Sequence, residues 1–138
     1  MLIRQFEIWL ADLNPQIGTE PGKTRPVLVI QTNLLNQIPH PSTIVCPITT
    51  NVNKDSEILR VHLKKGTANL HQACDVMIDQ IRAIDNKRLT KRLGVLPDEL
   101  IDLVKRSWDV VEKYVEKLNL NYSNSDITCL YLTNIVKR

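Results

Sequence analysis

The chain has 138 residues, a length that fits one domain with a substantial hydrophobic core and leaves little room for a second. Lys and Arg number 18 against 15 Asp and Glu, and the resulting net charge of +3 attracts polyanions only weakly. Two Trp, three Tyr and one Phe are too few to favour an RRM-like platform on which RNA bases stack. Any binding of nucleic acid is therefore expected to be mostly electrostatic and polar.

The cysteines and the first residues indicate where the protein works. Cys46, Cys74 and Cys129 are odd in number and widely spaced, without a Cys-x-x-Cys pair or a His at metal-ligand spacing. The opening MLIRQFEIWLADL carries Glu7 and Asp12 where a secretory signal needs an uninterrupted apolar stretch, and no later apolar run approaches the length of a membrane span. We therefore expect a cytoplasmic protein without a structural zinc site or a membrane segment.

The first predicted elements are two strands joined by a loop. Residues 7–13 are rich in β-forming residues, and the segment NPQIGTEPGK that follows holds two prolines and two glycines, which are typical of a turn or a mobile loop. PVLVI is apolar on both faces and predicts a buried central strand. Pro26 is expected to be its first residue, because proline has no N–H to give to a sheet.

Further strands are predicted downstream. Residues 42–49 (STIVCPIT) form one, and residues 57–63 alternate between apolar and polar side chains, which places His62 on the solvent-facing side. Residues 75–85 predict a fifth, mostly apolar strand. Residues 86–96 predict a short turn, with a sixth strand left open. Five or six short strands favour a compact barrel.

From Pro97 to Lys117, apolar residues recur at intervals of three and four, which is the period of an amphipathic helix. Pro97 suits the first helical turn, and the acidic Asp98 and Glu99 interact favourably with the helix dipole. The polar segment after the helix leads to ITCLYL, which the pattern does not place. The predicted fold class is α+β, mainly β, with a C-terminal amphipathic helix.

No residue pattern by itself defines an active site. The three histidines, His40, His62 and His71, have no spacing that brings them together, so we interpret them as ordinary surface residues. Asp79 lies in an apolar run and is either a hydrogen-bonded structural carboxylate or part of a site. A Gly-rich phosphate loop, a Gly-x-Ser-x-Gly elbow and a His-Glu-x-x-His pair are all absent from the sequence.

Basic residues gather at three places: a loop–strand junction, a turn and the surroundings of the fifth strand. Two interpretations stay open, a groove for RNA phosphates and an ordinary solvated surface. The residues are Lys23, Arg25, Lys64, Lys65, Arg82, Lys87, Arg88, Lys91 and Arg92.

The blocks EIWLADLNPQIGTEPGKTRPVLVIQ, IVCPITT and DQIRAIDNKRLTKRLGVL, followed by the amphipathic helix, resemble the MazF/PemK family of toxin ribonucleases in order and spacing. The resemblance covers roughly residues 6–117. It implies a small SH3-like barrel of the CcdB/MazF type, with a toxin domain at residues 1–118 and an extension of unknown role at residues 119–138. It also implies a homodimer whose grooves bind single-stranded RNA, and a cognate antitoxin whose acidic, disordered tail covers the same groove.

In that family the Arg of the T-R-P-V block and the Thr of the P-I-T block form the catalytic pair, and the matching residues are Arg25 and Thr49. The resemblance thus implies a metal-independent endoribonuclease, without a cofactor, that cleaves mRNA at specific sequences and arrests translation. Attack of a ribose 2'-OH on the adjacent phosphate builds negative charge, which a guanidinium and a hydroxyl donor can stabilise. The general base stays open between water and Asp79.

The loop at residues 14–24 resembles the family's mobile flap beside the RNA groove, and Asp79-Gln80 falls in a block used near the substrate. The residues implied to bind RNA are Glu20, Lys23, Asp79, Gln80 and Arg82.

Two other functions are compatible with the same barrel. One is a gyrase poison of the CcdB type, but the sequence lacks a Trp-Gly near its final NIVKR, and that activity has no use for the Arg25 and Thr49 blocks. The other is a catalytically inactive barrel that binds RNA, because a fold does not guarantee an activity.

Overall fold

The computed structural model describes residues 2–15, 18–19, 23–56 and 59–118. These residues form seven strands, two α-helices and three short 3-10 turns. The strands are β1 (Glu7–Asp12), β2 (Thr24–Val29), β3 (Ser42–Thr49), β4 (Arg60–Leu63), β5 (Cys74–Met77), β6 (Arg82–Asp85) and β7 (Leu89–Val95). The helices are α1 (Asn33–Asn36) and α2 (Asp98–Leu118), and the 3-10 turns are η1 (Thr67–Asn69), η2 (Ile78–Gln80) and η3 (Asn86–Arg88).

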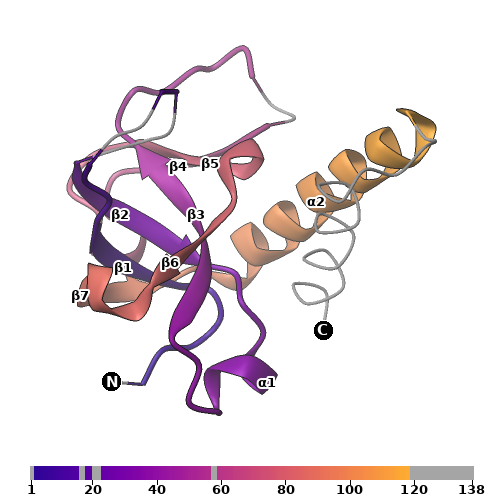
Figure 1. The fold of residues 1–138 in the computed structure, drawn as a ribbon. Helices are drawn as coiled ribbons and strands as arrows, with labels where there is room; N and C mark the ends of the chain where they lie inside the picture. The colour runs from indigo at the N-terminus through magenta and orange to yellow at the C-terminus, as the bar shows by residue number, and fades with distance from the viewer. Residues whose placement is uncertain (1, 16–17, 20–22, 57–58, 119–138) are drawn as a thin grey trace.

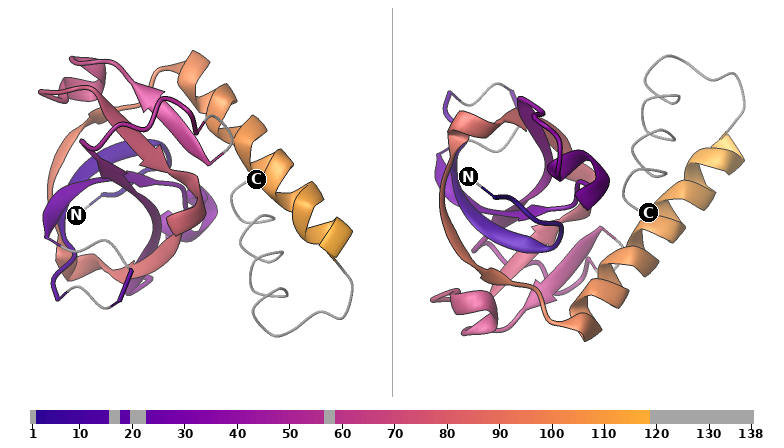
Figure 2. Two further views of the ribbon diagram at one scale, coloured as in Figure 1. Left: turned by 90° about the horizontal axis from the view of Figure 1, so that it is seen from above. Right: turned by 90° about the horizontal axis from the view of Figure 1, so that it is seen from below.

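The strands form one antiparallel sheet in the order β4-β5-β3-β2-β1-β7, and β6 pairs with β3 off this path. One edge of β3 pairs with β2, and the other edge pairs first with β6 and then with β5. Figure 1 shows this sheet with α2 leaving it on one side, and Figure 2 shows the strands curling into a barrel-like shape. The sequence predicted the mainly-β class correctly, although the number of strands is seven rather than five or six.

Two clusters of buried side chains cover opposite faces of β2 and β3. Leu28 and Cys46 belong to the main core, which includes Val104 and Trp108 of α2. Their neighbour Val27 belongs instead to a second core around Trp9 and the start of β7. Burying a side chain of this size contributes roughly 1.5–3 kcal/mol, so both faces hold these strands in place. The prediction of a buried central strand is therefore confirmed.

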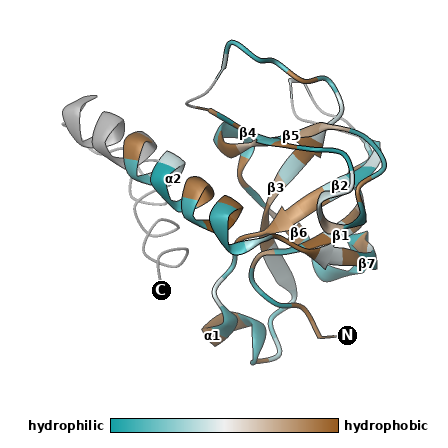
Figure 3. Cartoon of the chain, turned by 180° about the vertical axis from the view of Figure 1, so that it is seen from behind, coloured by the Kyte–Doolittle hydropathy of each residue, from teal (hydrophilic) through white to brown (hydrophobic). Residues whose placement is uncertain are grey.

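Helix α2 begins directly after Pro97, with Asp98 and Glu99 in its first turn, as the sequence predicts. Bands of apolar and polar residues alternate along it in Figure 3. Val104 and Trp108 are buried against the sheet, whereas Lys105 and Arg106 are exposed. In the part of the chain that the structure describes, no helix has the length and apolar character needed to cross a membrane.

Two predictions about the strands are wrong. The expected strand at residues 75–85 is interrupted by η2, and its two halves pair with different ends of β3. Thr49 pairs with Asp75 and Val45 with Arg82, so seven residue steps along this segment match four steps along β3, and η2 contains the three extra residues. Pro26 is the third residue of β2, not the first; pairing of β2 with β3 begins only after it, at Val27.

Candidate active site

Arg25 and Thr49 lie at the strand ends where β2 and β3 part. The pairing of β2 with β3 includes Leu28 with Cys46 and ends at Val27 with Pro47. Arg25 and Thr49 each lie two residues beyond this last pair, at the point where the two strands separate. Side chains two apart on a strand project to the same face, so Arg25 lies on the face of Val27, and Thr49 on the face opposite to Ile48 and the main core under α2. Both residues are half-buried.

Partial burial changes the electrostatics of Arg25. Removal from water disfavours the charged guanidinium and lowers the pKa of Arg25 below its ordinary value. Arginine nevertheless stays protonated at neutral pH. A positive charge that has lost part of its hydration interacts more strongly with a phosphate than one in bulk water. Arg25 is therefore suited to bind a phosphate at this strand end.

The hydroxyl of Thr49 is held in place by the turn that follows β3. Its Oγ1 accepts a hydrogen bond from the backbone N–H of Asn51 at 3.1 Å. A threonine hydroxyl can accept and donate at the same time, so its own O–H can be directed to a bound oxygen. The local sequence thus orients the second member of the predicted pair.

Beside Thr49 lies a cluster that the sequence did not predict, formed by Arg60, His62 and Asp75 and here called the Asp75 cluster. Asp75 is fully buried. His62 Nδ1 lies 2.5 Å from Asp75 Oδ1, and Arg60 Nη1 donates to Oδ2 at 3.3 Å. The backbone N–H of Asn53 donates to the same Oδ2 at 2.8 Å. His62 is exposed on β4 as predicted, and it also contacts a buried carboxylate, which the sequence did not predict.

The predicted RNA-binding residues lie in different parts of the sheet. Lys23 is exposed at the base of the first loop, where its N–H donates to Asn14 Oδ1 at 2.8 Å, two residues before Arg25. Asp79 and Gln80 belong to η2, which packs against β3. Arg82 begins β6, half-buried and paired with Val45. Glu20 lies outside the described residues.

Asp79 is exposed, whereas the fully buried carboxylate in this region is Asp75, so exposure gives no support to a structural role for Asp79 inside the apolar run. Asp79 still acts on the core electrostatically. The pKa of the buried Cys46 thiol is raised, first by burial and second by the negative charge of Asp79. Asp79 is therefore close to β3, and a role in the site stays a prediction.

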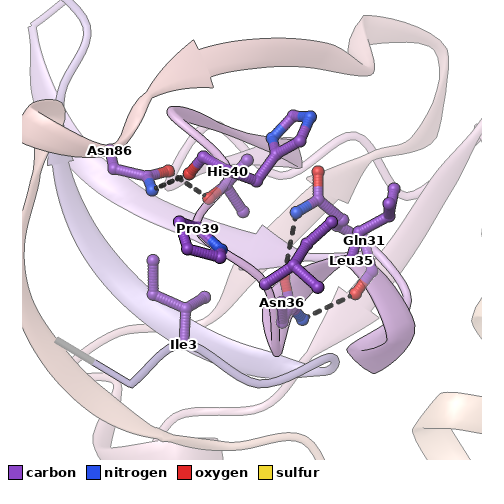
Figure 4. Close-up of a pocket in the computed structure, with 9 residues that line it drawn as sticks. Ile3, Gln31, Leu35, Asn36, Pro39, His40 and Asn86 are labelled. Atoms are coloured by element: carbon purple, nitrogen blue, oxygen red, sulfur yellow. Dashed lines mark hydrogen bonds between the residues drawn. The ribbon is translucent and has the colours of Figure 1, made fainter.

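Two hollows in the surface differ in their relation to this site. The smaller, of about 150 Å³, lies near Thr43 at the opposite end of β3. Figure 4 shows that its polar side chains bond to their neighbours: Asn86 donates to the His40 carbonyl at 2.7 Å, and Gln31 donates to Asn36 at 2.9 Å. We interpret it as a structural hollow because these polar groups are satisfied by the protein.

The larger hollow, of about 340 Å³, lies on the main-core face of the sheet, opposite to the face that carries the side chains of Arg25 and Thr49. Pro26 and Thr50, the chain neighbours of Arg25 and Thr49, line it together with apolar residues and with Asn69, His71 and Lys91. An apolar floor with a few polar groups is typical of a small-molecule or base pocket. Among the described residues, no group of three or more His, Cys, Asp and Glu is arranged to hold a metal ion.

The curled seven-stranded antiparallel sheet with a C-terminal helix defines a small α+β domain with the fold of the MazF toxins. Residues 4–110 match the model of the PemK-like, MazF-like toxins of type II toxin–antitoxin systems, and the chain belongs to this family.

Similar proteins agree with this assignment. The chain is 33% identical over 110 residues to the endoribonuclease EndoA of Bacillus subtilis, covering 80% of this chain and 94% of the relative. A crystal structure of MazF from Deinococcus radiodurans superimposes with a TM-score of 0.68 at 20% identity, over 80% of this chain and 96% of that one. A mycobacterial endoribonuclease in complex with its cognate antitoxin gives a TM-score of 0.62 at 14% identity, over 76% and 89%. The two structures support the fold alone.

Proposed function

We propose that this protein is the endoribonuclease toxin of a type II toxin–antitoxin system, which cleaves single-stranded mRNA at specific sequences without a metal and so arrests translation. Membership of the toxin family and the 33% identity to an endoribonuclease support this function. The observation that supports the assignment of Arg25 and Thr49 as the catalytic pair is the β2–β3 pairing, because its last pair, Val27 and Pro47, lies two residues from each of them. Strand register is independent of the motif spacing that first suggested the pair.

The proposed reaction uses the substrate's own nucleophile. The ribose 2'-oxygen loses its proton and bonds to the adjacent phosphorus, and the bond from phosphorus to the 5'-oxygen breaks. Arg25 holds the phosphoryl oxygens and protonates the leaving 5'-oxygen, while Thr49 donates to a non-bridging oxygen. The products are a 2',3'-cyclic phosphate and a 5'-hydroxyl. DNA is not cleaved, because it lacks the 2'-OH.

Recognition of the RNA is proposed to use residues around this pair. Lys23 is exposed two residues before Arg25 in the chain. We propose that Arg82 contacts phosphate, and that Glu20, Asp79 and Gln80 contact nucleotides along the same path.

We further propose that the toxin acts as a homodimer in the cytoplasm and that an antitoxin silences it. The structure most relevant to this point is the mycobacterial endoribonuclease solved with its cognate antitoxin. An acidic antitoxin segment would compete with RNA for the same basic groups, so a stoichiometric amount should abolish cleavage.

The test is cleavage of a defined long RNA in the presence of EDTA. Wild-type protein is compared with Arg25→Ala and Thr49→Ala, and with Arg106→Ala, which removes an exposed arginine on α2. We expect specific cuts with the wild type and Arg106→Ala, and none with the other two variants. A 2'-deoxy substitution at the scissile nucleotide should block cutting. Intact RNA together with gyrase inhibition would support a CcdB-like poison, and RNA binding without cuts an inactive barrel.

A further inference from the structure

The Asp75 cluster has a geometry that a purely structural ion pair does not require. Asp75 has no exposed side-chain surface, yet the carboxylate has three donors: His62 at one oxygen, and Arg60 and the Asn53 N–H at the other. A buried ion pair usually gains little stability over well-packed apolar residues of similar volume. Stability alone therefore gives little reason for a carboxylate at this position.

The cluster is next to Thr49 and on the same face of the sheet. Asp75 is the direct partner of Thr49 in the β3–β5 pairing, and His62 is the direct partner of Asp75 in the β4–β5 pairing. The three residues thus form one row across neighbouring strands. Strands are about 4.8 Å apart, so the Cα atoms of His62 and Thr49 are separated by on the order of 10 Å. Side chains from both residues can contact one nucleotide over this separation.

Hydrogen bonds also link the cluster to the Thr49 hydroxyl. Arg60 Nη1 donates to the carbonyl of Asn51 at 3.3 Å, and the N–H of Asn51 donates to Thr49 Oγ1. The carboxylate of Asp75 therefore holds both the turn that orients Thr49 and, separately, the imidazole of His62.

Asp75 also determines which nitrogen of His62 carries a hydrogen. An ionised carboxylate only accepts hydrogen bonds, so Nδ1 must be the donor and, in the neutral imidazole, Nε2 is the acceptor. His62 keeps 40% of its side-chain surface exposed. A buried Asp that holds Nδ1–H of an accessible His is the arrangement that serine proteases use to prepare a proton acceptor.

We propose that His62, oriented by Asp75, is the catalytic residue that accepts the proton of the ribose 2'-OH through Nε2. The proposal rests on the ribonuclease function above and supplies its general base in place of water or Asp79. As the proton moves to Nε2, the 2'-oxygen bonds to phosphorus, and the 5'-oxygen leaves with a proton from Arg25. The imidazolium then gives its proton to solvent and Arg25 takes one back from solvent, so both residues return to their starting states and no other reactant is needed.

The decisive variant is His62→Asn, because the asparagine amide can still donate to Asp75 from near the position of Nδ1 but has no group at the position of Nε2. His62→Gln provides a second variant, and His40→Asn near the far end of β3 is the matched control. We expect His62→Asn to slow cleavage by about 10²–10⁴-fold, the usual contribution of a general base. Binding of an uncleavable 2'-deoxy RNA, and the melting temperature, should match those of the wild type.

A second substrate separates a base from an acid. In an RNA whose scissile 5'-oxygen is replaced by sulfur, the leaving thiolate needs no proton, so loss of an acid is harmless whereas loss of a base is not. We expect His62→Asn to be slowed, relative to the wild type, by the same factor on this substrate as on ordinary RNA. Added imidazole should restore part of the activity of His62→Ala.

Wild-type rates in His62→Asn and His62→Gln would overturn the proposal, as would full recovery on the sulfur-containing substrate or a loss confined to RNA binding. Arg25→Ala and Thr49→Ala are measured in parallel. If Arg25→Ala and Thr49→Ala still cleave, these residues are not the catalytic pair. If these two variants are inactive but the His62 variants cleave like the wild type, the catalytic pair is supported and His62 is not the general base.

Discussion

Replacing Asp75 with alanine should destabilise the fold by about 3–5 kcal/mol, the usual cost of removing one partner from a buried ion pair. The structure indicates where this loss arises. The Asn53 N–H at 2.8 Å and Arg60 at 3.3 Å both lose the oxygen they share, and His62 loses its partner at 2.5 Å. Arg60 is 23% exposed and can recover some hydration, which favours the lower end of the range. Asp75→Asn keeps one carbonyl acceptor and should lose about half as much.

Urea unfolding followed by tryptophan fluorescence measures these losses, because Trp9 and Trp108 are both buried. The denaturation midpoint should fall while the slope stays constant. Asp55→Ala, at an exposed acidic residue in the nearby turn, is the control and should change stability by less than about 0.5 kcal/mol. All proteins are compared at one concentration, since the stability of an oligomer depends on it. Equal midpoints for Asp75→Ala and Asp55→Ala would refute the reasoning.

Three further predictions concern other parts of the molecule. Gly94→Ala should lower the free energy of unfolding by about 1–3 kcal/mol, because its Cβ would lie 2.8 Å from the backbone of η1; an unchanged melting temperature would contradict this close approach. Burial raises the pKa values of Cys46 and Cys74, so in a Cys129→Ser protein both thiols should react with a disulfide reagent at pH 8 at least ~100-fold more slowly than after unfolding in urea. Comparable rates before and after unfolding would show that these thiols are accessible. Thr49→Ser should retain RNA cleavage, whereas Thr49→Val should lose about 10²–10³-fold in kcat, and equal rates would exclude the hydroxyl from the reaction.

The elements that the sequence predicts well are those in which local pattern and burial agree. The strand at residues 42–49 has the predicted bounds, and α2 begins directly after Pro97. Residues 26–30 are apolar on both faces because a core covers each face of β2, and the sequence shows this directly. The pair Arg25 and Thr49 came from the resemblance to a family; local pattern alone did not single it out.

The Asp75 cluster could not be predicted, because its contacts join residues that are distant in the chain. Alternation along residues 57–63 does put Arg60 and His62 on one face, but it does not say which strand lies beside them. Asp75 is 13 residues from His62 and meets it only through the β4–β5 register. Asp79 was the more conspicuous carboxylate, yet η2 interrupts the strand and leaves it exposed. The alternation of apolar and polar residues predicts which face of a strand a side chain occupies, but it does not predict which residue of another strand that side chain contacts.

The sheet order has a consequence for the geometry of the proposed reaction. Thr49 is the last residue of β3. One edge of β3 pairs with β5, which carries Asp75, and β5 in turn pairs with β4, which carries His62. The other edge of β3 pairs with β2, the strand that contains Arg25. A phosphate held by the Thr49 hydroxyl would thus have the imidazole on one side and the guanidinium on the other. Transfer at phosphorus needs the attacking and leaving oxygens roughly in line, on opposite sides of the phosphorus atom. An acceptor for the 2'-OH proton and a donor to the 5'-oxygen are therefore needed on opposite sides too, and the strand order β4-β5-β3-β2 puts the strands of His62 and Arg25 on opposite sides of β3, the strand of Thr49.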